Sequence, residues 1–165
     1  MRVTNMWLKT IGVGLASLLL LACSGGKLNS GADNIAIAPV KLTIGEGFQE
    51  PLGYYESRPR FSWKIAKSSR LNVQTAYQIQ VASTPVLFDS GTLLWDSKKV
   101  LSSDTAWIKY EGQSLSSRQQ VYWRVRQWGE DNLVSNWSEP TSLEVGLLNN
   151  NAWQAKWIGH PDTAL

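Results

Sequence analysis

The chain has 165 residues, of which 43% are hydrophobic and 18% charged, so a packed core is expected and a disordered chain is excluded. This length suits one ordinary domain with short extensions. A single Cys and a single His cannot form a Cys/His zinc site or an intramolecular disulfide. The net charge of +3 would suggest a nucleic-acid partner, but part of this charge lies in the first 22 residues, which are considered next.

The first 22 residues have the pattern of an export signal. Arg2 and Lys9 flank the start of an apolar stretch, residues 11–22, that is too short to cross a bilayer as a helix. The stretch ends directly before Cys23, and this junction resembles a bacterial lipobox, in which the cysteine becomes the first residue and carries the lipid. We therefore expect residues 1–22 to be a lipoprotein signal peptide and Cys23 to be the lipidation site. The alternative is a plain secretory signal followed by an incidental cysteine.

Removal of this leader changes the charge and the expected partners. Cleavage before Cys23 would take away two basic residues and no acidic one, so the net charge would fall from +3 to +1. The charge then gives no support for a nucleic-acid partner, whereas acyl chains on Cys23 would bind a membrane. Ser24 follows the cysteine, which by resemblance to lipoprotein sorting favours the outer membrane of a two-membrane cell, on its periplasmic or surface side. Residues 23–38, the lipidated cysteine and the small polar residues after it, predict a flexible tether.

Short runs of alternating residues, separated by turn-forming residues, predict an all-β domain over residues 39–147. Prolines such as Pro59 and Pro140 lie between the runs, where strand breakers belong, and no convincing helical period follows residue 23. About seven short strands are typical of an antiparallel β-sandwich of the fibronectin type III or immunoglobulin kind. The candidate strands are 40–44, 60–65, 77–81, 94–100, 106–110, 121–128 and 141–145.

The last segment, residues 148–165, has a different character. A polar run of asparagines is followed by a new apolar element that contains Trp153 and Trp157. We expect a linker and then the opening of a further domain, because a fresh strand without a partner is an unfavourable end for a chain. Trp153 and Trp157 would pack against that following domain.

A series of short motifs runs through the predicted domain. The motifs are Pro51-Leu52-Gly53, Pro59-Arg60-Phe61-Ser62-Trp63, Gln74-Thr75-Ala76-Tyr77-Gln78-Ile79, Leu94-Trp95-Asp96-Ser97, Tyr110-Glu111-Gly112, Tyr122-Trp123-Arg124-Val125-Arg126, Trp137-Ser138-Glu139, Gly146-Leu147-Leu148 and Ala155-Lys156-Trp157-Ile158-Gly159. Each motif is weak alone, but in this order they resemble the N-terminal module of bacterial α-L-rhamnosidases, over about residues 40–160. One departure is Val121, where an aromatic residue is expected.

The resemblance implies a non-catalytic N-terminal module, a fragment of an exported, lipid-anchored α-L-rhamnosidase that releases terminal α-L-rhamnose from glycans. Such glycoside hydrolases are taken to invert the anomeric carbon with a carboxylic acid and a carboxylate base, and these lie in a later helical domain. The module would space and brace the later domains. One alternative is a stand-alone surface lipoprotein that binds carbohydrate or another protein through exposed tryptophans. Another is the product of a truncated or split gene.

Candidate acids and metal ligands are explained by local structure. Glu130 and Asp131 are adjacent on a predicted turn and cannot face each other across a sugar. Asp96 is placed to bond local backbone. His160 has no Cys, second His or carboxylate cluster nearby. We therefore expect no catalytic site, metal site or cofactor in this chain.

Tryptophan is unusually frequent, with nine in the chain. Trp63 and Trp123 alternate with aliphatic residues and are predicted to be core. Trp107 is predicted to face outwards. It is then either a stacking platform for a rhamnose-containing glycan or, as we favour, a contact with a neighbouring module.

Two arginines and a tryptophan predict a cation–π contact. Arg124 and Arg126 share one face of the predicted strand 121–128, opposite the core positions, and Tyr122 and Trp128 are placed on the same face. Trp137 lies just before the last strand, which would pair with that strand. We therefore expect Trp137 to stack between the two guanidinium groups.

Overall fold

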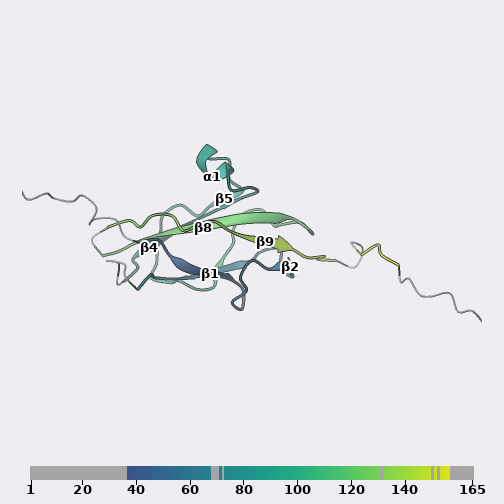
Figure 1. Ribbon diagram of the computed structural model, residues 1–165, viewed down its shortest axis with the longest axis horizontal. Coiled ribbons are helices and arrows are strands. Elements are labelled where there is room, and N and C mark those ends of the chain that lie inside the picture. Colours follow the sequence, from purple (N-terminus) through teal and green to yellow (C-terminus); the bar gives the residue numbers. More distant parts are fainter. Residues whose placement is uncertain are drawn as a thin grey trace, which may run out of the picture. The chain divides into compact units, whose positions relative to one another are not determined.

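The computed structural model describes residues 37–67, 71, 73–130, 132–149, 151 and 153–156. The predicted leader, Cys23 and most of the tether lie outside these residues, as do Asp131, Trp157 and His160. The described residues form nine strands and one short helix (Figure 1): β1 (Val40–Ile44), β2 (Leu52–Tyr54), β3 (Arg60–Lys64), β4 (Ala76–Ala82), α1 (Leu87–Ser90), β5 (Trp95–Asp96), β6 (Val100–Leu101), β7 (Ile108–Lys109), β8 (Gln120–Trp128) and β9 (Thr141–Val145).

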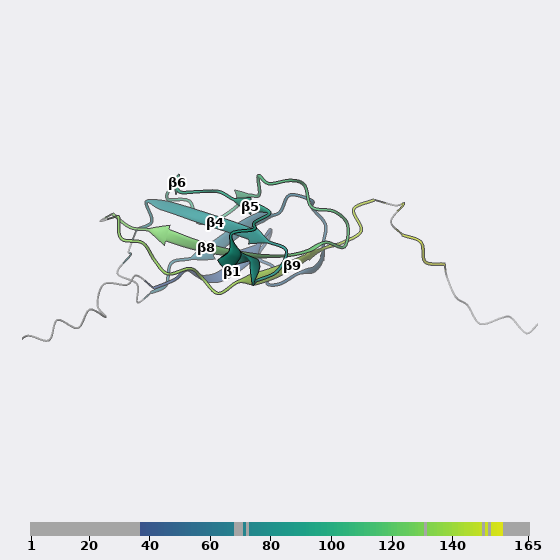
Figure 2. The same ribbon diagram turned by 90° about the horizontal axis from the view of Figure 1, so that it is seen from above.

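The strands form two sheets. The smaller sheet has the order β1-β3-β7, and the larger has the order β2-β9-β8-β4-β5, with β6 also paired to β4. The pairs are antiparallel except β2–β9, which is parallel. Figure 1 shows β1 below the layer that holds β4 and β8, and Figure 2 shows the domain from above. The prediction of an all-β, largely antiparallel sandwich is confirmed.

The core lies between the sheets and follows the alternation of the sequence. On β8, Val121, Trp123 and Val125 are fully buried, because every second side chain of a strand faces the same side. From the facing sheet, the ring of Phe61 lies 4.4 Å from that of Trp123, centroid to centroid. Trp63 is buried in the same cluster. The predicted core positions of Trp63 and Trp123 are confirmed.

Two of the predicted strands are shorter than the sequence indicates. The run 94–100 is broken into β5 and β6, because Lys98 has a left-handed backbone with φ 57°. Its N–H donates to the Asp96 carboxylate at 2.8 Å. The run 106–110 is reduced to β7, since Trp107 has φ 60°, which an extended strand does not allow.

The sequence does not predict β2 or α1. β2 has only three residues, one of them Gly53 at φ 82°, which is too short a run to show an alternating pattern. The four residues of α1 are likewise too few to show a helical period. β2 nevertheless extends the larger sheet beyond β9. Among the described residues, no helix has the length and apolar character needed to cross a membrane.

Candidate functional site

Polar side chains on the outer face of the larger sheet form one hydrogen-bonded network. The register of β4 and β8 places Gln78 opposite Arg126 and Gln80 opposite Arg124. Each arginine Nε–H donates to the Oε1 atom of its glutamine at 3.0 Å. The side-chain amides of Gln78 and Gln80 donate in turn to the carboxylate of Asp96, at 2.7 and 3.3 Å. One carboxylate on β5 is thus linked through two amides to two guanidinium groups on β8.

These contacts keep Asp96 ionised. Burial would raise its pKa, but hydrogen bonds from Gln78, from the backbone and ammonium of Lys98, and from Gln80 outweigh that effect. The pKa of Asp96 therefore lies below its ordinary value. A group that stays ionised at neutral pH is a poor proton donor, so Asp96 acts here as a structural acceptor.

Aromatic rings and cations alternate along the same face. The ring centroid of Trp137 lies 4.5 Å from the guanidinium carbon of Arg124 and 4.6 Å from that of Arg126. The guanidinium carbon of Arg124 also lies 4.5 Å from the ring centroid of Phe88, and that of Arg126 lies 5.0 Å from the ring centroid of Trp128. Lys99 Nζ adds a last contact, 4.8 Å from that ring. This ladder runs through Phe88, Arg124, Trp137, Arg126, Trp128 and Lys99.

The loop between β8 and β9 carries Trp137 into the ladder. Ser138 fixes this loop to β8: its N–H donates to the Val125 carbonyl at 2.9 Å, and its Oγ accepts from the Val125 N–H at 3.1 Å. These two bonds hold the preceding residue, Trp137, against the outer face of the strand.

The structure brings together Arg124, Arg126 and Trp137, the three residues that the sequence singled out. Sequence reasoning missed Gln78 and Gln80, although they alternate with core residues in the run 77–81 and so could have been placed on the outer face. Phe88 and Lys99 were also missed, whereas Trp128 was placed on the same face of the strand as the two arginines. Phe88 lies on the unpredicted helix α1, so no pattern pointed to it.

The other candidate acid pair is only partly described. Glu130 is exposed after β8, and Asp131 lies outside the described residues. In the part of the chain that the structure describes, no group of three or more His, Cys, Asp or Glu side chains is placed to hold a metal ion.

Trp107 lies in a groove between the edges of the two sheets. Its side chain is 53% exposed, and its backbone N–H donates to Ser62 Oγ at 3.0 Å. The groove has a volume of about 320 Å³. We call it the edge groove, and its lining residues are Tyr77, Trp95, Ser97, Val100, Trp107, Ile108, Lys109 and Glu111.

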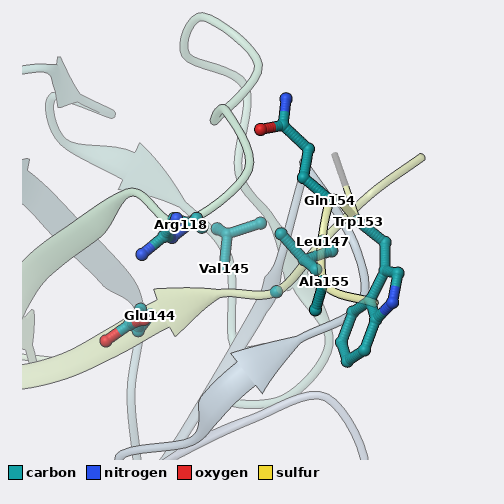
Figure 3. A pocket seen from close by; sticks show the side chains of 8 residues that line it. Arg118, Glu144, Val145, Leu147, Trp153, Gln154 and Ala155 are labelled. Atoms are coloured by element: carbon teal, nitrogen blue, oxygen red, sulfur yellow. The ribbon is translucent and has the colours of Figure 1, made fainter. Parts of the chain in front are cut away.

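A second surface lies where the chain leaves β9. Leu147 is 40% exposed and Trp153 is 65% exposed, and both line an open pocket of about 540 Å³ with Arg118 and Ala155 (Figure 3). Figure 3 shows Trp153 and Ala155 on the segment after β9 and Arg118 across the pocket from them. We call this the exit pocket. Its other lining residues are Glu144, Val145, Gly146 and Gln154.

Backbone contacts fix the direction in which the chain leaves β9. The Gly146 N–H donates to the Tyr54 carbonyl at 2.8 Å, and the Leu148 N–H donates to Ser117 Oγ at 3.0 Å. A Cβ atom on Gly146 would lie 2.8 Å from the carbonyl oxygen of Gly53. Only glycine allows the two backbones to approach so closely.

Comparison with known proteins identifies the domain. The family described as "Rha78A-like, N-terminal immunoglobulin domain" matches residues 39–149. The chain belongs to this family. This chain is 51% identical over 126 residues to the α-L-rhamnosidase of Alteromonas sp. (strain LOR), and 52% identical over 120 residues to that of Formosa agariphila. These matches cover 76% and 73% of this chain but only 14% and 13% of the two enzymes.

Solved structures agree with the family assignment. The α-L-rhamnosidase of Streptomyces avermitilis, in complex with L-rhamnose, matches the Rha78A-like domain with a TM-score of 0.70 and 38% identity. That of Dictyoglumus thermophilum matches with a TM-score of 0.68 and 36% identity. Both matches cover 76% of this chain, and they cover 12% and 14% of the respective enzyme chains. The resemblance to the N-terminal module of α-L-rhamnosidases is confirmed.

Proposed function

We propose that this chain is the non-catalytic N-terminal module of an exported α-L-rhamnosidase, which it helps to space and brace. The observation that carries the proposal is the family match over residues 39–149, in relatives that share the domain over about one seventh of their length. The rest of such a protein would supply the carboxylic acid and carboxylate that hydrolyse terminal α-L-rhamnose.

The exit pocket supports the bracing role. Leu147 and Trp153 are both exposed there. Exposed apolar side chains that gather on one surface are typical of an interaction site. In a longer protein, the following domain would bury them, and the fixed backbone at Gly146 would set the angle between the two domains.

The test compares this chain with the longer protein encoded by the same gene. Both are purified and assayed for hydrolysis of p-nitrophenyl α-L-rhamnoside. We expect activity from the longer protein and none from the chain alone. A longer protein without activity on rhamnosides, or an active chain, would contradict the proposal. A stop codon directly after Leu165 would instead favour the stand-alone lipoprotein.

We also propose that residues 1–22 are removed and that Cys23 is lipidated. The junction of the apolar stretch with Cys23 supports this, and the expected location is the periplasmic or surface side of an outer membrane. Wild-type protein should incorporate labelled palmitate and sediment with membranes, whereas Cys23→Ser should do neither. As a test of sorting, Ser24→Asp should keep the lipid and move the protein to the inner membrane.

A further inference from the structure

The edge groove is built from the open edges of both sheets. β5 and β6 form the edge of the larger sheet beyond β4, and β7 is the edge of the smaller sheet. Residues from all three strands line the groove. Its volume of about 320 Å³ lies at the lower end of the range for small-molecule sites, which is the size for a single sugar ring and not for a long ligand.

Two indole rings form the aromatic part of the edge groove. Trp95 is half-buried and held by an edge-to-face contact with Tyr110, at 5.3 Å between ring centroids. Trp107 is exposed, and its left-handed backbone at φ 60° costs about 1–2 kcal/mol for a side chain with a Cβ. The bond from its N–H to Ser62 holds it in this conformation. Residues kept in such strained backbone conformations cluster at functional sites.

Several polar side chains in the edge groove have no hydrogen bond to a described residue, whereas the Ser97 hydroxyl donates to the Lys98 carbonyl at 2.8 Å. Tyr77 is only 8% exposed, and burial raises the pKa of its hydroxyl, with a further rise from the negative charges of Asp104 and Glu111. No hydrogen bond joins this hydroxyl to a described residue, and its oxygen is not one of the fully buried side-chain atoms that lack a partner. The other polar side-chain groups without a hydrogen bond to a described residue are the indole N–H groups of Trp95 and Trp107, the Lys109 ammonium and the Glu111 carboxylate.

We infer that the edge groove binds one 6-deoxyhexose ring, such as a terminal α-L-rhamnosyl unit of a glycan. A pyranose has an apolar C–H face, which packs on an indole ring, and a rim of hydroxyl groups that needs both donors and acceptors. Lys109 and the indoles offer donors, and Glu111 offers acceptors. Val100 and Ile108 line the same groove and suit the methyl group that replaces the hydroxymethyl of an ordinary hexose. The choice of sugar rests on the proposed function.

The edge groove and the exit pocket share no lining residue. The chain leaves the domain after β9, whereas the groove lies beside β5, β6 and β7. In the larger sheet β8 and β4 separate β9 from β5, which corresponds to three strand spacings, or about 14 Å. The edge groove is thus another part of the surface than the exit pocket, although Lys109 of the groove lines a third hollow together with Leu148, which follows β9.

The test is a titration of the ¹⁵N-labelled 165-residue chain with methyl α-L-rhamnoside, followed by NMR. We expect saturable shifts of the indole N–H signals of Trp95 and Trp107. Methyl α-L-mannoside differs from this probe only by the hydroxyl on C6. We expect it to bind at least about threefold more weakly, because its hydroxymethyl group would face Val100 and Ile108.

Variants assign the binding to the edge groove. Trp107→Asn removes the indole while keeping a residue type that tolerates positive φ, and it should weaken binding at least about tenfold. Glu111→Gln, which changes no packing, should weaken it about threefold. Trp153→Ala, an exposed tryptophan in the exit pocket, is the matched control and should leave binding unchanged.

Several results would overturn the inference. They are the absence of saturable shifts up to about 100 mM sugar, equal affinity for the two sugars, and an equal loss of binding in Trp153→Ala. Binding is measured on the chain alone and without hydrolysis. Its failure is therefore distinguishable from failure of the proposed function, which the rhamnosidase activity of the longer protein decides.

Discussion

The indole ring of Trp137 lies 4.6 Å from the guanidinium carbon of Arg126, on a face of the domain where both arginines contact amides and aromatic rings. The Nε–H of Arg126 donates to Gln78, whose amide donates to Asp96. This hydrogen bond orients the guanidinium of Arg126, and the rings of Trp137 and Trp128 lie within 5.0 Å of its carbon. Trp137 comes from the loop between β8 and β9, so this contact fixes that loop to the sheet.

Trp137→Ala should therefore destabilise the domain. It removes two cation–π contacts worth about 0.5–1 kcal/mol each, so we expect the free energy of unfolding to fall by at least about 1–2 kcal/mol and Tm to fall by several degrees. Urea and thermal unfolding of the 165-residue chain measure this change. Trp153→Ala is the control, since its side chain is 65% exposed, and it should change stability little. An unchanged Tm in Trp137→Ala would refute a structural role for the ladder.

Asp96 should make the stability of the domain depend on pH. Its pKa is lower in the folded chain than its ordinary value, so its contribution is fully present above the pKa of the unfolded chain. That contribution is lost as the pH falls through the folded pKa. Wild type should therefore lose more stability than Asp96→Asn between about pH 5 and pH 2, while the variant is the less stable of the two at pH 7.

The measurement is the urea midpoint of both proteins across this pH range. Glu139→Gln, which removes an exposed carboxylate, is the matched control and should follow the wild-type profile. Parallel profiles for wild type and Asp96→Asn would show that the bonds from Gln78 and Gln80 do not stabilise the ionised form.

The fold could be predicted where burial alternates along a strand. In the run 121–128 every second side chain faces the core, and Trp123 was placed correctly because its neighbours at that spacing are apolar. The alternation fails at Lys98 and Trp107, which both have a left-handed backbone. The N–H of Lys98 bonds the Asp96 carboxylate and that of Trp107 bonds Ser62 Oγ, and residue type alone does not predict these contacts. β2 pairs in parallel with β9, and its three residues show no pattern of their own.

The candidate sites were likewise predictable only where local residue spacing determines them. The Arg124 and Arg126 spacing placed two cations on one face, but the Phe88 end of the ladder lies on a one-turn helix that tertiary packing places there. The edge groove could not be predicted, because it exists only where the edges of two sheets meet. The sequence predicted that Trp107 faces outwards. It could not predict that Tyr77 and Trp95 line the same groove, because they come from strands distant in sequence.

Gly146→Ala should disturb the exit from β9. An added Cβ would lie 2.8 Å from the Gly53 carbonyl oxygen, so β2 and β9 must move apart or the chain must leave at another angle. We expect a loss of about 1–3 kcal/mol, as in other overpacked sites, and faster amide hydrogen exchange at Tyr54 and Gly146. Ser142→Ala, on the preceding strand β9, should change stability by less than about 0.5 kcal/mol. Equal effects of the two substitutions would show that the close approach is not required.

Trp153→Ala should matter only when a following domain is present. In the 165-residue chain its side chain is exposed, so the change in Tm should be within error. In the longer protein the same substitution removes a buried indole from the proposed contact and should lower Tm by several degrees or separate one unfolding transition into two. Calorimetry of the two pairs of proteins gives the answer. An unchanged unfolding profile of the longer protein would argue against docking at the exit pocket.

Loss of the side-chain amide should change the free energy of unfolding in opposite directions at two buried glutamines, Gln127 and Gln74. Gln127 is fully buried on β8, and neither polar atom of its amide has a partner among the described residues. Gln74 is 2% exposed, and its amide accepts from the Trp63 indole at 3.0 Å and donates to the Asp104 carbonyl at 2.7 Å. A buried polar group without a partner costs about 1–3 kcal/mol, whereas removing one member of a bonded pair leaves the other unpaired.

Gln127→Met should therefore raise the free energy of unfolding by about 1 kcal/mol, and Gln74→Met should lower it by about 1–3 kcal/mol. Both substitutions keep an unbranched side chain of similar length, so the comparison isolates the amide. Urea unfolding of the two variants under one condition measures both changes. If Gln127→Met destabilises the domain as much as Gln74→Met does, the Gln127 amide has a partner in the folded chain.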